Sequence, residues 1–177
     1  QVRSYYPAAM GHILNTQGIA RFPEREYEMV RLGIGLYGLG SYEGMEPLEE
    51  VVQWKCRISQ VSEVLPGESV GYSRAFVADR AERYATLPVG YADGLSRHLS
   101  GGKGQVIING QACAILGNVC MDMVMVDVSD VAVAAGDEVV IIGAGQGANE
   151  LARAAGTIGY EVLTGIGARV PRFYIKD

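Results

Sequence analysis

The sequence predicts a mainly β fold: an antiparallel β-barrel domain with one or two short helices, preceded by a remnant of an α/β barrel. Two observations predict the β-domain. After residue 51, short segments alternate apolar and polar residues, as half-buried antiparallel strands do, and turn residues separate them. The 24 glycines are spread over many turns, which suits a chain of short strands.

The first forty residues predict a different architecture. Residues 11–16 predict a strand that runs into a loop. Residues 22–30 predict a helix with Pro23 in its first turn, where its missing N–H is not needed. A short, glycine-rich apolar run at 32–38 predicts a second strand. Unbroken apolar strands around a helix indicate part of an α/β barrel of the TIM type.

A polar stretch that contains glycine and proline, residues 40–50, predicts the domain boundary. We therefore expect residues 1–45 to be the barrel remnant with its linker, and residues 46–177 to be the β-domain.

Within the β-domain, residues 52–58 alternate as one half-buried strand, and Pro66-Gly67 predicts a turn. Asn109-Gly110 predicts a tight hairpin, because both positions of such a turn need positive φ. Further strands are expected at 84–89, 124–128, 138–142 and 169–175, the last at a sheet edge because it contains a proline, and helices at 148–155 and 158–163.

Composition excludes several classes of function. A net charge of −5 without a basic stripe argues against nucleic-acid binding, and no apolar run approaches the length of a membrane span. An odd count of three cysteines favours reduced thiols and a cytoplasmic setting. No metal-ligand spacing is present, and two histidines make a Ser-His-Asp triad improbable. The start at Gln1, without an initiating methionine or signal peptide, suggests a piece of a longer chain.

Three glycine-bearing motifs follow one another in the β-domain: Gly71-Tyr72-Ser73, Gly90-Tyr91-Ala92-Asp93-Gly94 and Gly117-Asn118-Val119-Cys120-Met121-Asp122. Each alone has an ordinary explanation. Tyr72 fits a half-buried strand tyrosine, Asp93-Gly94 fits a turn, and Cys120 and Met121 fit core packing.

In this order and spacing, and together with the Asn15-Thr16, Arg21-Phe22-Pro23 and Arg169-Val170-Pro171-Arg172 segments, the chain resembles alanine racemase over essentially its whole length. The resemblance implies a pyridoxal 5'-phosphate isomerase that interconverts L-alanine and D-alanine for bacterial cell-wall peptidoglycan. It also implies a barrel domain followed by a β-domain, a cytoplasmic head-to-tail homodimer and a small amino acid as substrate.

The reaction removes the α-proton from one face of the substrate and returns a proton on the other, so it needs two proton-transfer groups. The resemblance implies that Tyr72, offered to the partner subunit, is one of them. The other is the family's Schiff-base lysine, and none of Lys55, Lys103 and Lys176 has the apolar context that would suit it. We therefore expect this chain alone to be inactive.

The resemblance also implies which residues hold the cofactor. Asn15, Thr16, Gly33 and Ile34 match phosphate-binding positions, and Arg31 matches the arginine that faces the pyridine nitrogen. From the residues alone, Gly33 equally fits tight packing, and Arg31 fits a helix-end arginine near carbonyl groups.

For the substrate, the resemblance implies that the Met121 backbone N–H binds the carboxylate and that Tyr91 lines the entrance. Asp93 and Asp122 are expected to orient neighbouring groups, and Cys120 to pack rather than react.

Two positions depart from the family pattern. Ala168 stands where many relatives carry a tyrosine, and Asn118 where many carry an arginine. Without this phenol and this long cation, the approach to the substrate site would be wider and less charged. A serine or broad-specificity amino acid racemase is therefore an alternative. A barrel-type decarboxylase fits less well because it lacks the two tyrosines at this spacing. A non-catalytic dimerisation β-domain is the alternative from another class.

Overall fold

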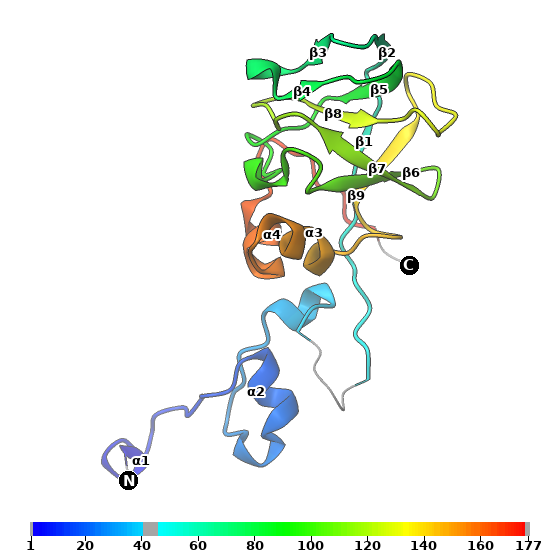
Figure 1. Ribbon diagram of the computed structural model, residues 1–177. Helices are drawn as coiled ribbons and strands as arrows, with labels where there is room; N and C mark the ends of the chain where they lie inside the picture. Colours follow the sequence, from blue (N-terminus) through cyan, green and yellow to red (C-terminus); the bar gives the residue numbers. More distant parts are fainter. Residues whose placement is uncertain (1, 41–45, 176–177) are drawn as a thin grey trace. The chain divides into compact units, whose positions relative to one another are not determined.

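The computed structural model describes residues 2–40 and 46–175. The chain divides into two compact units, Gln1–Val52 and Gln53–Asp177 (Figure 1). The second unit contains the sheets and two of the α-helices, and each unit is described by itself below.

The second unit is built on a seven-stranded sheet in which every neighbouring pair is antiparallel. The strands are β1 (Trp54–Arg57), β2 (Gln60–Val64), β5 (Glu82–Leu87), β6 (Gln105–Ile108), β7 (Gln111–Leu116), β8 (Val124–Asp127) and β9 (Glu138–Ile142). Their order in the sheet is β1-β9-β6-β7-β8-β5-β2. The two edge strands, β1 and β2, follow each other directly in the chain. The sheet is therefore strongly curled, which brings its two edges together where β1 leads into β2 (Figure 1). The predicted antiparallel β architecture is confirmed.

Local sequence explains the strands that were predicted correctly. In β1, Trp54 is buried while Lys55 and Arg57 are exposed, as alternation requires. The turn between β6 and β7 is formed by Asn109 and Gly110, with φ of 50° and 76°. Positive φ at both positions matches the twist of the flanking strands, so the hairpin forms where it was predicted.

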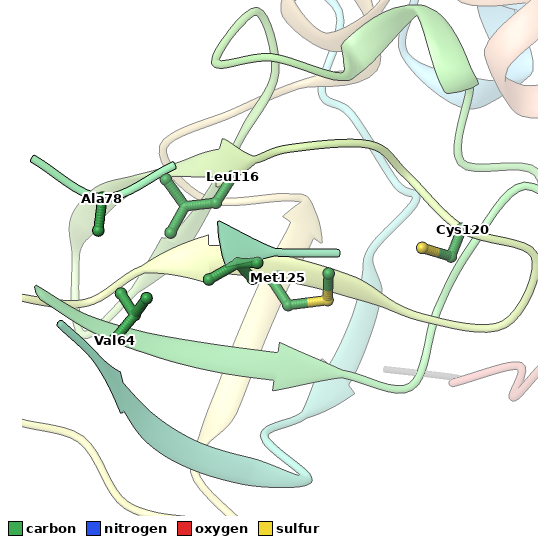
Figure 2. Packing of buried hydrophobic residues seen from close by; sticks show 6 residues of the cluster. Val64, Ala78, Leu116, Cys120 and Met125 are labelled. Carbon is green, nitrogen blue, oxygen red and sulfur yellow. The ribbon is translucent and has the colours of Figure 1, made fainter. Parts of the chain in front are cut away.

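A cluster of buried side chains packs under a second, two-stranded sheet, β3 (Ser69–Val70) with β4 (Phe76–Val77). Its members come from both sheets and their loops: Val64, Val70, Ala78, Leu116, Cys120 and Met125 (Figure 2). Cys120 is 6% exposed and lies among apolar neighbours, in agreement with the expected packing role.

Two helices complete the second unit. Helix α3 (Ala148–Ala155) has the predicted bounds and ends at Gly156, whose left-handed φ of 74° suits a glycine cap. Helix α4 (Gly159–Gly165) follows after a break and packs against α3 (Figure 1). Helix α3 also contacts the 3-10 turn η4 (Arg97–Leu99), which lies close to the residues of the candidate site. Within the described residues, no helix is long and apolar enough to span a bilayer.

The first unit does not contain the predicted strand, helix and strand. It consists of α1 (Val2–Tyr5), α2 (Thr16–Arg21) and the 3-10 turns η1 (Pro23–Arg25) and η2 (Ile34–Tyr37). Helix α2 starts at Thr16, where a loop was expected, because the Asn15 side chain caps it by accepting the Gly18 N–H at 3.0 Å. The predicted helix at 22–30 is reduced to η1, and the predicted strand at 32–38 is replaced by η2.

Parallel barrel strands obtain their hydrogen bonds from neighbouring strands. Among residues 2–40 and 46–50, the pairing found is one isolated parallel bridge between Asn15 and Arg31. These segments therefore lack the partners that would hold them in regular strands.

The predicted edge strand at 169–175 is also wrong. Residues 171–175 are exposed and belong to no helix or strand. The segment is held instead by side-chain contacts of its arginines, described with the site.

Candidate functional site

One surface pocket of the second unit, with a volume of about 420 Å³, brings together the three site residues predicted in the β-domain. Tyr72, Tyr91 and Met121 all line it, although they come from three separate loops. Arg97 and Asn118 are also part of its lining. The pocket therefore combines two phenols with a guanidinium group and an amide.

Tyr72 does not lie in a strand; it begins the 3-10 turn η3 (Tyr72–Arg74), between β3 and β4. The turn requires unusual backbone angles: φ is 78° at Gly71, 61° at Ser73 and 49° at Arg74. Non-glycine residues in the left-handed region cost free energy and often mark functional positions. The turn presents Tyr72 to solvent, with 74% of the residue exposed.

The Tyr72 backbone is held by two donors. Its carbonyl oxygen accepts the Ala75 N–H at 3.3 Å and the Asn118 side-chain amide at 3.4 Å. The loop that carries Asn118 lies close to the strand before the turn, since a Cβ built on Gly117 would be 3.1 Å from the Val70 carbonyl oxygen. Asn118 thus connects the third motif to the turn that carries the phenol.

Tyr91 and Met121 are connected by backbone hydrogen bonds between their loops. The Tyr91 N–H donates to the Cys120 carbonyl and the Ala92 N–H to the Met121 carbonyl, both at 3.0 Å. A Cβ on Gly90 would lie 2.3 Å from the Cys120 oxygen and 2.4 Å from the Met121 oxygen. Only glycine permits this approach, so the second motif needs Gly90 to align its tyrosine with the third motif.

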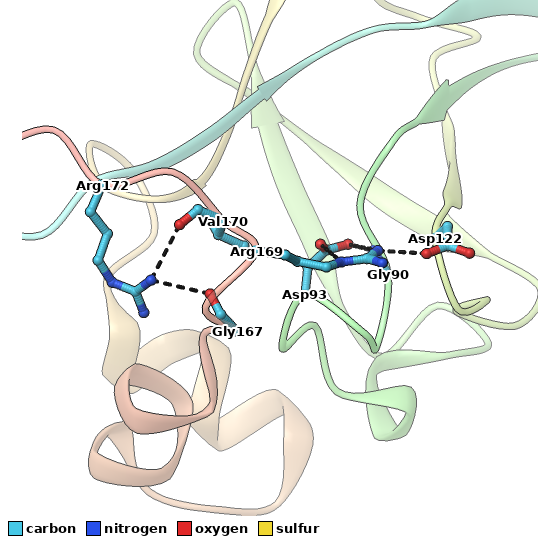
Figure 3. Close-up of polar contacts among 7 residues, drawn as sticks. All are labelled: Gly90, Asp93, Asp122, Gly167, Arg169, Val170 and Arg172. Carbon is cyan, nitrogen blue, oxygen red and sulfur yellow. Dashed lines mark hydrogen bonds and ion pairs between the residues drawn. The ribbon is translucent and has the colours of Figure 1, made fainter.

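Both loops are joined to the C-terminal segment by one arginine. The Arg169 guanidinium binds Asp93 through Nε at 2.6 Å and Nη2 at 3.1 Å, and Nη2 also binds Asp122 at 2.5 Å (Figure 3). Asp93 also accepts the Gly90 N–H at 2.8 Å. Hydrogen bonding to Arg169 lowers the pKa of Asp93 and outweighs the opposing effect of burial; the Gly90 N–H lowers it further. In return, hydrogen bonds to Asp93 and Asp122 raise the pKa of Arg169.

Asp93 was expected either to form a turn or to orient a neighbouring group, and it does both. It accepts the Gly90 N–H within its own turn and binds Arg169 from the C-terminal segment. The Gly167 N–H donates to the Asp93 backbone carbonyl at 2.8 Å. Arg172 donates to the Gly167 and Val170 carbonyls (Figure 3). It also donates to the Ile166 carbonyl and thereby holds the C-terminal segment in place.

The residues predicted to bind the cofactor lie together in the first unit. The buried Thr16 hydroxyl accepts the N–H groups of Gly33 and Gly35, each at 3.2 Å. Arg31 donates its backbone N–H to the Leu14 carbonyl, while its Nη2 donates to the Ile13 carbonyl at 3.1 Å. These bonds place 13–16 beside 31–35.

This arrangement suits an anionic group in two respects. A Cβ on Gly33 would meet no atom within 4 Å, so the space over its backbone is open. Because the Thr16 oxygen accepts two N–H groups, its own hydrogen remains able to donate. The first unit therefore provides a hydroxyl donor beside an open glycine backbone, features that suit a bound phosphate.

Lys55, Cys56 and Cys113 are poorly suited to act as reactive groups. Lys55 pairs with Glu138 at 2.9 Å across β1 and β9, and Lys176 lies outside the described residues. Burial raises the pKa of the Cys56 thiol to about 12 and that of Cys113 to about 11, which opposes formation of a reactive thiolate. The described residues contain no group of histidine, cysteine and carboxylate side chains arranged to hold a metal ion.

Sequence reasoning missed two residues of the site. Arg97 follows the second motif by three positions, and its place on the helical turn after Gly94 was the available signal. Arg169 was noted only as part of the closing motif, because nothing local reveals that its partners are 76 and 47 residues away.

The comparisons with known proteins agree with this geometry. Residues 51–174 match the family model described as alanine racemase, C-terminal domain. The chain is 42% identical to alanine racemase 1 of Clostridium acetobutylicum and 44% identical to alanine racemase of Symbiobacterium thermophilum. Each alignment covers 94% of this chain, but 45% and 46% of the relatives. The chain thus spans about half the length of the curated relatives that it matches.

Solved structures give the same result. Alanine racemase from Bartonella henselae with covalently bound pyridoxal phosphate matches with a TM-score of 0.87 at 35% identity, over 96% of this chain and 48% of that one. Alanine racemase from E. faecalis matches with a TM-score of 0.88 at 28% identity, over 98% of this chain and 50% of that one. This chain is therefore a C-terminal portion of a member of the alanine racemase family.

Proposed function

We propose that the protein to which this chain belongs is a pyridoxal 5'-phosphate-dependent isomerase that interconverts L-alanine and D-alanine by a two-base mechanism. The observation that carries the proposal is the pocket that gathers Tyr72, Tyr91 and Met121 on the β-domain. The names of the relatives and the cofactor in the Bartonella henselae structure support the reaction and the cofactor class.

Tyr72 is the proton-transfer residue that this chain supplies. The bound cofactor would delocalise the electrons left on the substrate when its α-proton is removed. Tyr72 would exchange a proton with the α-carbon through its phenol oxygen, from one face of the substrate. Since a free phenol titrates near ~10, the phenolate would need a nearby cation or hydrogen-bond donor in the assembled site. A lysine from the remainder of the protein would serve the other face.

The first unit would hold the cofactor. The Thr16 hydroxyl and the Ile34 backbone N–H would donate to the phosphate, with Asn15 fixing the start of the helix beside them. Gly33 would leave room for the phosphate, while its own N–H donates to the Thr16 hydroxyl. Arg31 would face the pyridine nitrogen. Because a guanidinium does not give up its proton near neutral pH, that nitrogen would remain unprotonated. This would limit side reactions that depend on a strong electron sink.

The second unit would bind the substrate. The Met121 backbone N–H would bind the carboxylate, and Tyr91 would line the entrance to the site. The clamp formed by Arg169 with Asp93 and Asp122 would hold these two loops in register. A site in which the Gly90 turn and the Met121 loop are rigidly connected loses less entropy when it orders a small amino acid.

Residues 1–45 would be the end of the cofactor-binding barrel, and residues 46–177 the β-domain. The protein would form a head-to-tail homodimer in which Tyr72 serves the partner's cofactor. It would act in the bacterial cytoplasm and supply D-alanine for peptidoglycan. This chain alone would be inactive, because its lysines lack the required context.

A second candidate activity, racemisation of serine or of a broader set of amino acids, is favoured by two observations. Ala168 is a small exposed residue next to Arg169, and the amide of Asn118 is turned to the Tyr72 carbonyl. Neither side chain supplies a phenol or a long cation, and Asn118 lines the pocket of Tyr72, where Arg97 already supplies a guanidinium. Substituting Ala168→Tyr in the complete protein should lower turnover of serine relative to alanine. Equal turnover ratios in the variant and its parent would contradict this part of the proposal.

Mixed dimers of the complete protein test the main proposal. Tyr72→Phe and Arg31→Glu subunits should each be nearly inactive, because each lacks one component of every site. If Tyr72 serves the partner, half of the randomly mixed dimers contain one site with both native residues, so about a quarter of wild-type activity returns. No recovery would mean that both residues belong to one subunit's site. Unchanged activity of Tyr72→Phe alone would favour a scaffold role for the β-domain.

A further inference from the structure

We infer that Asn118 is a positioning residue for Tyr72: its side-chain amide holds the strained turn from which the phenol projects. The inference rests on the proposed role of Tyr72 and assigns to Asn118 a task beyond filling the place of a longer cation. It starts from the contact between the amide nitrogen of Asn118 and the backbone carbonyl oxygen of Tyr72, at 3.4 Å.

The chemistry of the contact determines the orientation of the amide. The Tyr72 carbonyl can only accept a hydrogen bond, so the Asn118 atom that faces it must be the NH2 group. An aspartate has the same shape but no donor, and its charge would repel the carbonyl. Asparagine and aspartate at this position therefore differ in the hydrogen bond and in charge, but not in packing.

The turn has reason to need an external donor. Ser73 and Arg74 both have positive φ, and Tyr72 itself is 74% exposed, so packing of the phenol does not hold the turn. The Ala75 N–H bonds the same Tyr72 carbonyl from within the turn, at 3.3 Å. Asn118 is the donor to that carbonyl from outside the turn.

The loop of Asn118 is itself well fixed. Val119 donates its N–H to the Ser100 hydroxyl at 3.0 Å, and Val119 and Cys120 on the C-terminal side are buried. Gly71 also packs closely, since a Cβ there would be 3.0 Å from the Met125 methyl carbon. Asn118 thus connects the turn of Tyr72 to a loop that is fixed in the second unit. A displacement of an acid–base group by about 1 Å can reduce turnover severalfold or more.

The test compares Asn118→Asp in the complete protein with a matched control, Asn109→Asp. The Asn109 side chain also donates to a backbone carbonyl, that of Ala132 at 3.0 Å, but it lies on the β6–β7 turn and does not line the pocket. Both substitutions remove one amide donor and add one negative charge. Asn118→Ala serves as a second, uncharged variant if the aspartate prevents folding.

Two readouts separate positioning from general damage. Hydrogen–deuterium exchange of peptides covering 72–76 should be faster by roughly 3–10-fold in the Asn118 variants and unchanged in the Asn109 variant. In turnover, kcat/KM should fall by roughly 3–10-fold. It falls equally in both directions, because the two enantiomers have equal free energy. The isotope effect of α-deuterated substrate should nevertheless rise for one enantiomer only, the one whose proton Tyr72 removes.

Unchanged exchange at 72–76, or a raised KM with unchanged isotope effects, would overturn the inference, since Asn118 would then contact substrate or do nothing. Tyr72→Phe measured in parallel tests the proposed function independently. If Tyr72→Phe loses activity while Asn118→Asp matches Asn109→Asp, only the inference about Asn118 fails. If Tyr72→Phe keeps full activity, the proposed function fails.

Discussion

Arg169 and Asp93, 76 residues apart, form a two-point ion pair in which Nε and Nη2 of the arginine bind separate carboxylate oxygens at 2.6 Å and 3.1 Å. The carboxylate is buried, whereas about half of the arginine side chain remains exposed. The pair connects the C-terminal segment to the turn that carries Tyr91, and its contact with Asp122 extends the connection to the Met121 loop.

Removing the arginine should therefore destabilise the second unit. Arg169→Ala leaves Asp93 buried without its ionic partner, and a buried charge that has lost its partner is costly. Thermal unfolding should occur at a lower temperature than in the parent chain. The matched control is Arg153→Ala on α3, which removes an exposed pair with Glu150 at 3.8 Å and should change little. Equal melting temperatures for the two variants would contradict this role for Arg169.

The same pair predicts a pH dependence. Because the pKa of Asp93 is lower in the folded chain than in the unfolded one, its ionised form contributes stability above the unfolded pKa of about 4. That contribution is lost as pH falls through the folded pKa. Asp93→Asn should thus lower the free energy of unfolding by about 1–3 kcal/mol at neutral pH. The difference from the parent should shrink below about pH 4, as measured by urea unfolding; a difference that does not change with pH would show that ionisation of Asp93 does not contribute to stability.

Gly90 offers a steric prediction. In Gly90→Ala the new methyl group would lie 2.3 Å from the Cys120 carbonyl oxygen, so the two loops must separate. We expect a loss of about 2–4 kcal/mol in the free energy of unfolding. Gly165→Ala is the control, because a Cβ there meets no atom within 4 Å and φ is not positive. A loss in Gly90→Ala no larger than in the control would mean that the loops are not held as described.

The buried thiols give a chemical prediction. With a pKa of about 12 for Cys56 and about 11 for Cys113, very little thiolate exists at pH 8. Both should react with a thiol reagent such as dithionitrobenzoate at least about a hundredfold more slowly in the folded chain than in urea. Mass spectrometry of the labelled peptides checks each thiol separately, and rapid labelling of either one in the folded chain would show that its environment is open.

The sequence predicted the parts of the fold that depend on local pattern. The period of two in β1, the Asn109-Gly110 turn and helix α3 all have causes within a few residues. Residues 169–175 failed as a strand because their conformation depends on distant partners such as Asp93. The strands expected within residues 1–40 failed for a related reason, since a parallel strand such as the one expected at 32–38 forms only beside other strands.

The site was predictable in its members but not in its geometry. Tyr72, Tyr91 and Met121 line one pocket, as motifs in three loops had indicated, although their catalytic and binding roles remain predictions. The turn around Tyr72 was not predictable, because serine and arginine do not favour the positive φ that Ser73 and Arg74 adopt. The hydrogen bond from Asn118 to the Tyr72 carbonyl is a tertiary contact that the local sequence does not reveal.

The central claim is that the phenol of Tyr72 exchanges a proton with the α-carbon of the substrate. The most direct measurement is racemisation and α-proton exchange in deuterium oxide by the complete protein with Tyr72→Phe. Racemisation should fall by at least about a hundredfold, because general acid–base groups contribute factors of about 10²–10⁴. One enantiomer should still exchange its α-proton through the lysine on the opposite face. Wild-type racemisation in Tyr72→Phe, or equal loss of α-proton exchange from both enantiomers, would contradict the account.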